Sequence, residues 1–312
     1  MKKFTLEDHA DSFLPEGKEW KLVWHDEFDG TELDETKWGF RLNFWGQRFK
    51  TFTTEGVELD GNSHIRLHMI KKGDDYYSPL LQTGSLTYDM PKEDDGFWPF
   101  GEAEKPKFMH RYGYYEIRCR LPKNRGWHAA FWLQAPGVGS HPNPRFAGVE
   151  CDIMENYRQH VDGKMIGGTI WGGIGKNIDM SGHFVWDYEE TADGWHYYGV
   201  DWSPDGYVFY ADGKEIGRVL PPEREAERNI MRENPDSKTW ILPGSTAIGP
   251  VSEVEQFILV TTECHGYRGP GFFSAPEGHP AGTPAPILKE AVLPDYFEVD
   301  HVRVFDQIET EK

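Results

Sequence analysis

The sequence is poor in cysteine and has no long apolar run, and each shortage excludes a class of protein. Three cysteines in 312 residues are too few, and odd in number, for a disulfide framework. Packing in a core is the expected role of all three: Cys119, Cys151 and Cys264. No stretch is apolar and long enough to span a membrane, and no apolar segment of a secretion signal follows the first three residues. We therefore expect a cytoplasmic protein, or a secreted one that has lost its leader.

Positive charge is also scarce. Lys and Arg total 33 against 52 Asp and Glu, which gives a formal net charge of −19. This balance argues against nucleic-acid and membrane partners, and weakly against heavily sulfated polymers, although a local basic cleft can override it. No His/Cys spacing suggests zinc, and no glycine-rich loop suggests a phosphate site. We expect a monomer without a catalytic cofactor.

Turn-forming residues and aromatics are abundant instead, with 34 Gly, 21 Pro and 12 Trp. Many short segments alternate apolar and polar residues, as half-buried strands do: 20–28, 57–60, 65–70, 112–121, 195–204, 207–213, 257–262 and 296–305. This pattern predicts an all-β sandwich of two antiparallel sheets. We expect a peripheral arm over 1–19 and one domain over 20–312. Within that domain, a charge-dense insertion at 221–250 reads as helical from 223 to 233 and is expected to overhang a cleft.

The most informative stretch is 149–156, where three acids lie between apolar residues. In a strand, Glu150 and Asp152 face one side and their apolar neighbours face the core, but Glu155 falls on the wrong parity. A β-bulge at 153–154 would bring Glu155 onto the same face. The two glutamates would then be about 13 Å apart along the backbone, with carboxyls roughly 5–6 Å apart, near the spacing of retaining glycosidases. A solvated outer face is the alternative, but like charges on one face are costly and typical of functional sites.

Two segments, and weaker similarity on either side of them, together resemble glycoside hydrolase family 16. The run ECDIME from Glu150 to Glu155 is similar to the family's bulged catalytic signature. The run GWHAAFWL at 126–133 resembles its G-x-W-P-A-F-W-L strand, with His128 where proline is commoner. The similarity extends from 24–28 to 299–304, nearly the whole chain. It implies a concanavalin A-like jelly roll whose concave sheet forms the substrate cleft.

The resemblance also implies roles for the acids. Glu150 is the expected nucleophile, Glu155 the general acid/base, and Asp152 a hydrogen-bond partner of Glu150. Two negative groups this close raise one pKa, and we expect the raised pKa on the general acid.

Further residues are expected to contact a sugar substrate: Trp127, Trp132, Trp171, His183, Trp45 and Arg48. Strand parity places Trp127 and Trp132 on opposite faces. We favour Trp127 for the cleft, and the alternative for Trp132 is a position in the core. A lone histidine such as His183 is more often structural. The resemblance further implies a structural calcium, with Asp300 and main-chain oxygens near Glu27 and Gly61 as ligands, since hard cations take oxygen ligands.

The predicted function is a retaining endo-glycoside hydrolase that cleaves O-glycosyl bonds in a β-linked polysaccharide, β-1,3- or β-1,3-1,4-glucan first. A β-galactan hydrolase of the agarase, porphyranase or carrageenase kind is the alternative, because Arg pairs with sulfate-like groups. The arginines that favour it are Arg41, Arg48, Arg125, Arg145 and Arg158. A non-catalytic carbohydrate-binding relative normally lacks one of the two glutamates, and both are present. Transglycosylation uses the same machinery and stays open.

Overall fold

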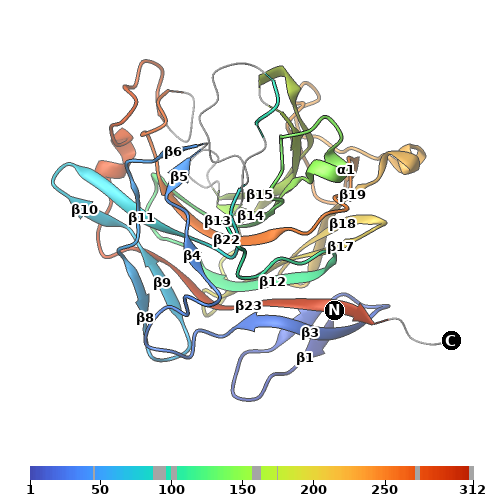
Figure 1. The fold of residues 1–312 in the computed structure, drawn as a ribbon, viewed down its shortest axis with the longest axis horizontal. Coiled ribbons are helices and arrows are strands. Elements are labelled where there is room, and N and C mark those ends of the chain that lie inside the picture. The colour runs from blue at the N-terminus through green and yellow to red at the C-terminus, as the bar shows by residue number, and fades with distance from the viewer. Residues whose placement is uncertain are drawn as a thin grey trace.

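The computed structural model describes residues 1–44, 46–86, 96–99, 104–156, 163–173, 175–270 and 275–308. Two large sheets dominate it, and they stack face to face (Figure 1). Most neighbouring strands in them are antiparallel. The all-β sandwich expected from the alternating segments is therefore confirmed.

The first sheet, called here the β14 sheet, carries the acidic strand near its centre. Its strands run in the order β10 (Ile70–Lys72), β11 (Asp75–Gln82), β22 (Phe257–Cys264), β13 (Trp127–Gln134), β14 (Glu150–Asn156), β15 (Lys164–Gly172), β16 (Ile178–Asp187) and β20 (Trp240–Ile241). Two short strands, β4 (Gly39–Phe40) and β7 (Phe52–Thr53), also pair with β11.

The second sheet, called the β23 sheet, contains the strand nearest the C-terminus. Its order is β21 (Thr246–Ile248), β19 (Lys214–Leu220), β18 (Gly206–Ala211), β17 (His196–Ser203), β12 (Gly113–Arg120), β23 (Tyr296–Ile308), β9 (Ile65–His68) and β8 (Val57–Leu59), with β3 (Glu19–Asp26) paired to β23. The remaining elements are short: β1 (Lys2–Phe4), β2 (Ser12–Leu14), β5 (Asn43–Phe44), β6 (Gln47–Arg48), α1 (Pro144–Ala147), η1 (Gly175–Asn177), η2 (Pro222–Glu227) and η3 (Pro286–Glu290). In the described part of the chain, no helix has the length and apolar character needed to cross a membrane.

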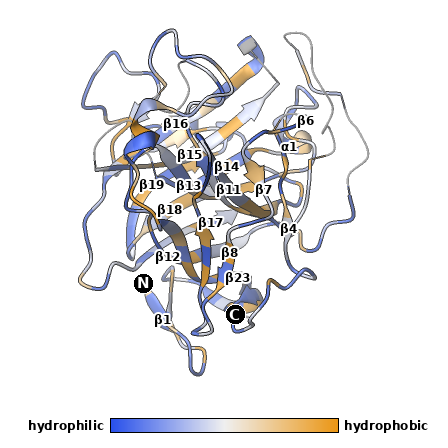
Figure 2. Cartoon of the chain, turned by 90° about the vertical axis from the view of Figure 1, so that its left-hand side faces the viewer, coloured by the Kyte–Doolittle hydropathy of each residue, from blue (hydrophilic) through white to orange (hydrophobic). Residues whose placement is uncertain are grey.

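The core lies between the two sheets, where alternate residues of facing strands meet. Ile117 and Cys119 of β12 are fully buried there, as are Phe131 and Leu133 of β13 and Cys151 of β14. Figure 2 shows the hydrophobic colour gathered mainly on the strands, with largely hydrophilic loops around them. All three cysteines are buried and free, as their strand positions predict.

The N-terminal arm is more structured than the peripheral segment we expected. Strands β1 and β2 form a hairpin beside the β23 sheet (Figure 1). Leu14 joins a small apolar cluster with Trp20, Tyr114 and Phe305, and Phe4 packs edge-on to Phe305. The arm therefore covers part of the outer face of the sandwich.

The helix predicted at 223–233 is wrong. Only the six-residue 3₁₀ turn η2 forms there, because the segment has no apolar stripe and its side chains form exposed ion pairs three residues apart, Arg224–Glu227 and Arg228–Glu225. The rest of the insertion supplies β20 and β21, which pair in parallel with β16 and β19. The insertion thus adds an edge strand to each sheet.

Candidate active site

The acidic strand carries the bulge that the parity of its glutamates requires. Glu155 pairs with Ala130 and Glu150 with Gln134, so a five-residue step on β14 spans four residues of β13. The register shifts beside Ile153 and Met154 in both neighbouring strand pairs. The predicted bulge is therefore confirmed. It brings Glu150, Asp152 and Glu155 onto the wall of one pocket.

This pocket lies over the centre of the β14 sheet and combines acids, guanidinium groups and aromatic rings. The residues that line it are Arg41, Phe44, Phe52, Leu80, His128, Ala130, Trp132, Glu150, Asp152, Glu155, Thr261, Glu263 and Arg268. They come from β7, β11, β13, β14, β22 and adjoining loops. Rings for stacking and polar groups for hydroxyls suit a carbohydrate.

Glu150 is held at one end of the acidic row. Nε2 of Gln134, directly across the strand pair, donates a hydrogen bond of 2.6 Å to Oε2 of Glu150. Burial raises the pKa of Glu150 to about 7, and the charge of Glu155 adds to the rise. Arg41 and Arg268 oppose it through their positive charges. The carboxyl is therefore poised to ionise near neutral pH.

Asp152 lies between the two glutamates, where ionisation is least favourable. Burial first, and then the charges of Glu155 and Glu150, raise its pKa well above the ordinary aspartate range. Nε2 of His183 is 3.9 Å from Oδ2 of Asp152, and burial lowers the pKa of this histidine. A Cβ on Gly168 of β15 would lie 3.1 Å from the His183 ring, so a glycine there allows the imidazole to approach. We infer a protonated Asp152 beside a neutral imidazole.

Glu155 has a different environment from the other two acids. Burial is the largest influence and works against its ionisation, but Nε2 of His128 lies 3.1 Å from its Oε1 and favours the charged form. His183 and Arg268 add to the effect, so the pKa of Glu155 is lowered. The expectation of a raised pKa on this residue is therefore wrong. The raised values fall on Glu150 and Asp152, because they lack an equally close histidine.

The two tryptophans of β13 have the opposite placement to the one we favoured. Trp127 is 0 % exposed, and its Nε1 donates a hydrogen bond of 3.1 Å to Asp295 within a satellite core cluster. Trp132 lines the pocket, where its Nε1 donates a 2.9 Å hydrogen bond to Thr261 and the Arg41 guanidinium lies 5.1 Å from its ring. The bulge is on β14, so parity along β13 is unbroken and Trp132 shares the face of His128.

Of the other predicted substrate contacts, some lie near the acids and some do not. His183 lies beside the acids, as expected. Trp171 faces the core side of β15, the side of Cys151, and packs against the core, so its predicted place in the cleft is wrong. Arg48 lines a neighbouring hollow that shares Arg41 with the pocket, and it donates to the carbonyl of Leu42 at 2.7 Å. Trp45 lies outside the described residues.

Several residues around the acids were not singled out from the sequence as a group: the lining residues Arg41, His128, Thr261, Glu263 and Arg268, and the Glu150 partner Gln134. The alternation of polar and apolar residues along β13 could have identified two of these residues, His128 and Gln134. His128 and Gln134 are polar residues on the parity opposite to Phe131 and Leu133, so they mark the cleft face. Arg268 and Arg41 lie on loops, where no periodicity indicates a direction.

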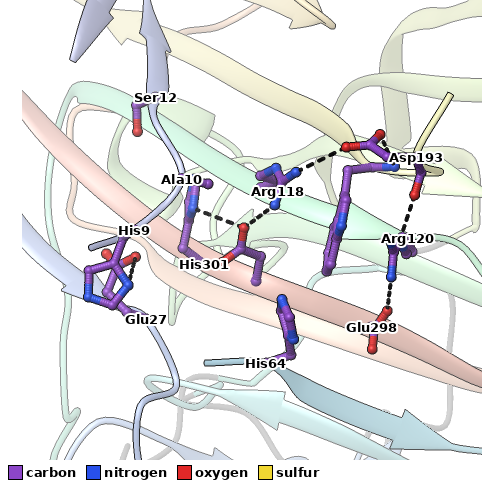
Figure 3. Close-up of polar contacts among 12 residues, drawn as sticks. His9, Ala10, Ser12, Glu27, His64, Arg118, Arg120, Asp193, Glu298 and His301 are labelled. Carbon is purple, nitrogen blue, oxygen red and sulfur yellow. Dashed lines mark hydrogen bonds and ion pairs between the residues drawn. The ribbon is translucent and has the colours of Figure 1, made fainter. Parts of the chain in front are cut away.

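Two of the residues named for calcium, Asp300 and Glu27, have side chains that are paired with arginines. Nη1 of Arg118 donates to Asp300, and Arg303 binds both carboxylate oxygens of Glu27, at 2.8 and 2.7 Å. A guanidinium is therefore the side-chain partner of each carboxylate, while the main-chain oxygens near Glu27 and Gly61 stay a prediction for calcium. Arg118 and Arg120 extend among the neighbouring acids Asp193 and Glu298 (Figure 3). Gly61 lies in an exposed turn at the edge of the same region.

The fold and the site together define a class: β-sandwich proteins with paired carboxylates on a bulged strand of a cleft-forming sheet. A sequence profile described as "Glycosyl hydrolases family 16" matches residues 60–242, more than half of the chain. The chain belongs to this family.

Individual proteins agree with this membership. Glucan endo-1,3-beta-glucosidase A1 of Niallia circulans is 26% identical over 218 residues, which cover 64% of this chain and 29% of that protein. Glucan endo-1,3-beta-glucosidase of Cryptopygus antarcticus is 28% identical over 74% of this chain and 81% of its own length. Beta-porphyranase B of Zobellia galactanivorans is 26% identical over 66% of this chain and 70% of its own.

Among solved structures, the laminarinase catalytic domain of Thermotoga maritima has the same fold. Its TM-score is 0.60 at 19% identity, over 94% of this chain and 100% of that one. The jelly-roll architecture implied by the sequence is therefore confirmed.

Proposed function

We propose that the chain is a retaining, endo-acting glycoside hydrolase of a β-linked polysaccharide, with β-1,3- or β-1,3-1,4-glucan as its substrate. The observation that carries this proposal is the bulge on β14, which gathers Glu150, Asp152 and Glu155 on one wall of a pocket. The two glucan endo-1,3-beta-glucosidases among the relatives support the choice of substrate.

In the first step, the ionised carboxylate of Glu150 attacks the anomeric carbon of the bound sugar. Glu155 transfers a proton to the glycosidic oxygen, so the bond from that oxygen to the anomeric carbon breaks and the leaving chain departs as an alcohol. Gln134 orients the nucleophile, and the positive charge of Arg41 favours its ionised form. The product of this step is a glycosyl ester on Glu150.

In the second step, Glu155 acts as a base. It removes a proton from a water molecule whose oxygen attacks the anomeric carbon, and the Glu150 carboxylate leaves. Two inversions at one carbon give overall retention of configuration. Asp152, protonated between the glutamates, adds no third negative charge during the cycle.

Trp132 supplies the apolar surface that the sugar requires. The C–H face of a pyranose packs on an indole, and the hydrogen bond from its Nε1 to Thr261 fixes the plane of the ring. The indole lies on the strand next to the acids, so a stacked sugar would be held within reach of both glutamates.

The test is digestion of laminarin, mixed-linkage β-glucan, agarose, porphyran and carrageenan, followed by reducing ends and by the anomeric configuration of the first product. We expect β-configured oligosaccharides from a glucan with the wild type and none with Glu150→Ala. Glu116→Gln is a matched control, since Glu116 is a buried glutamate on the opposite sheet. Equal activity of Glu150→Ala and wild type would exclude the proposed nucleophile.

A second candidate substrate is an anionic β-galactan. Two guanidinium groups, those of Arg41 and Arg268, line the pocket, and Arg binds sulfate groups bidentately. The similarity to a β-porphyranase adds support. Of the other arginines considered, Arg145 pairs with Glu253 away from the pocket, and Arg158 lies outside the described residues. Release from porphyran or carrageenan, with laminarin intact, would select this candidate.

A further inference from the structure

The histidine beside the general acid is a departure from the motif that the β13 strand resembles, where proline is commoner. His128 lies on the cleft face of β13, two residues from Ala130, the cross-strand partner of Glu155. Its Nε2 is 3.1 Å from Oε1 of Glu155, and the two side chains are 8% and 16% exposed. A contact at this distance between two largely buried groups that can both carry a proton is chemically significant.

The charge states of the free site conflict with the roles of the glutamates. The first step requires a proton on Glu155 and a negative charge on Glu150. In the structure, His128 lowers the pKa of Glu155, while burial raises that of Glu150. Glu155 alone would therefore have lost its proton at a pH where Glu150 still retains one. His128, whose Nε2 lies 3.1 Å from Oε1 of Glu155, is close enough to hold the proton for the leaving oxygen.

We propose that His128 and Glu155 share one proton, and that His128 is a positioning residue which stores this proton for the leaving group. The inference rests on the proposed hydrolase function and adds a proton donor to it. An imidazolium beside a carboxylate contains the same number of protons as a neutral imidazole beside a carboxylic acid. The pair is thus ready to act as an acid although Glu155 itself is ionised.

Substrate binding converts one form of the pair into the other. A sugar over the pocket excludes water, and an ion pair loses more than a neutral pair when water is removed. The proton then moves from Nε2 of His128 to Oε1 of Glu155, and from Glu155 to the glycosidic oxygen. In the second step, the proton taken from water returns to the pair. No external proton donor is needed within one cycle.

The surrounding charges leave the pair as the main proton-exchanging unit on this side of the pocket. Glu263, opposite His128 on β22, is neutralised by Arg268, whose Nη2 donates to it. His183 faces the acids from β16, and burial lowers its pKa. The titratable and charged groups around the pair are Arg41, Glu150, Asp152, His183, Glu263, His265 and Arg268.

The first test is the pH dependence of kcat/KM for wild type and His128→Gln on the polymer that the enzyme cleaves. Glutamine can still donate a hydrogen bond to Glu155 but stores no proton. We expect the alkaline limb to move about one pH unit or more toward lower pH, with the acidic limb of Glu150 unchanged. His110→Gln is the matched control, because it removes a histidine that pairs with a carboxylate, Asp306, away from the pocket, and its alkaline limb should stay in place. An unmoved alkaline limb in His128→Gln overturns the proposal.

The second test varies how much the leaving group depends on protonation. Aryl glycosides of the released oligosaccharide are compared, with 4-nitrophenol, phenol and 2,4-dinitrophenol as leaving groups. We expect His128→Gln to lose roughly 10²-fold in kcat/KM with phenol and less than about threefold with dinitrophenol, which departs without protonation. Equal losses with all three leaving groups would mean that His128 only maintains the shape of the pocket.

A third measurement needs no substrate. The Glu155 side-chain carboxyl is titrated by ¹³C NMR in wild type and His128→Gln, and its signal is assigned with Glu155→Gln. Loss of the histidine should raise the titration midpoint of Glu155 by about one pH unit or more. No change would overturn the shared proton. If the wild type cleaved no polymer, the proposed hydrolase function would fail while this titration still decided whether the pair exists.

Discussion

The two sheets each contain a group of buried charges, and the two groups are built on opposite principles. The cleft cluster comprises His128, Glu150, Asp152, Glu155 and His183 on the β14 sheet. The outer network consists of paired groups on the β23 sheet: Glu27 with Arg303, Asp300 with Arg118, Glu298 with Arg66 and Arg120, and Glu116 with His301. In the outer network each carboxylate has a nitrogen partner on a neighbouring element. In the cleft cluster, three acids follow one another on a single strand.

This difference distinguishes buried charges that stabilise the fold from buried charges that are suited to a reaction. A buried carboxylate with a bidentate arginine, such as Glu27, fixes the position of the strands that carry the pair. Burial, and then the charge of neighbouring acids, raises the pKa of Glu150 and Asp152, whereas burial alone raises that of Glu116 in the outer network. A protein retains the cost of such neighbouring acids where the groups are needed for a reaction. The contrast supports the proposal that the cleft cluster carries out the reaction.

The largest expected effect is on the reaction. Glu150→Gln should lower kcat by about 10⁴-fold or more, because no other group can form the glycosyl ester. The fold should be intact, with an unchanged far-ultraviolet circular dichroism spectrum. A loss of less than about tenfold would show that the charges of the cleft cluster are not the reacting groups.

The next effect is on stability and belongs to the outer network. Arg303→Met leaves Glu27 buried without its bidentate partner, and we expect unfolding free energy to fall by about 3–5 kcal/mol in urea titrations. Replacing both residues with methionine should restore most of the loss, since no unpaired charge is left. If the double variant were as unstable as the single one, the pair would contribute by packing and not by charge.

A smaller expected effect is the pH dependence of thermal stability, which compares the cleft cluster with the outer network. The pKa of Glu150 is raised from 4.5 to about 7, so the folded state binds this proton more tightly than the unfolded chain does. That stabilising contribution is complete below pH 4.5 and is lost as the pH rises through about 7. Glu150→Gln should therefore gain thermal stability over wild type by about 2 °C or more between pH 4 and pH 8. A constant difference across this range would contradict the raised pKa.

The smallest expected effect is that of a chelator. Because guanidinium groups occupy the positions next to Asp300 and Glu27, EDTA should change Tm by less than about 1 °C. Differential scanning calorimetry with EDTA, and then with added calcium chloride, measures this directly. A fall of several degrees that calcium reverses would mean that the ion binds in place of these ion pairs.

The sequence predicted the features that depend on local periodicity. The bulge followed from the parity of Glu150, Asp152 and Glu155 alone, and the alternating segments correctly predicted the two sheets. The choice between Trp127 and Trp132 failed although the same periodicity applied. The polar parity of His128 and Gln134 would have placed Trp132 in the cleft.

Features that depend on tertiary pairing were beyond this reasoning. Arg118 and Asp300 are 182 residues apart, and only the alignment of β12 with β23 brings them together. The calcium expectation was made without this ion pair in view, and it stays a prediction. The contact between His128 and Glu155 similarly depends on the register of β13 against β14, which the sequence does not specify.

The insertion at 221–250 also has a consequence for behaviour at high concentration. Its strands β20 and β21 occupy the hydrogen-bonding edges of β16 and β19, the last long strands on that side of each sheet. Without them, two rows of backbone amides and carbonyls would face solvent and would be open to pairing with a second molecule. The insertion therefore protects part of these two edges from pairing with a second molecule.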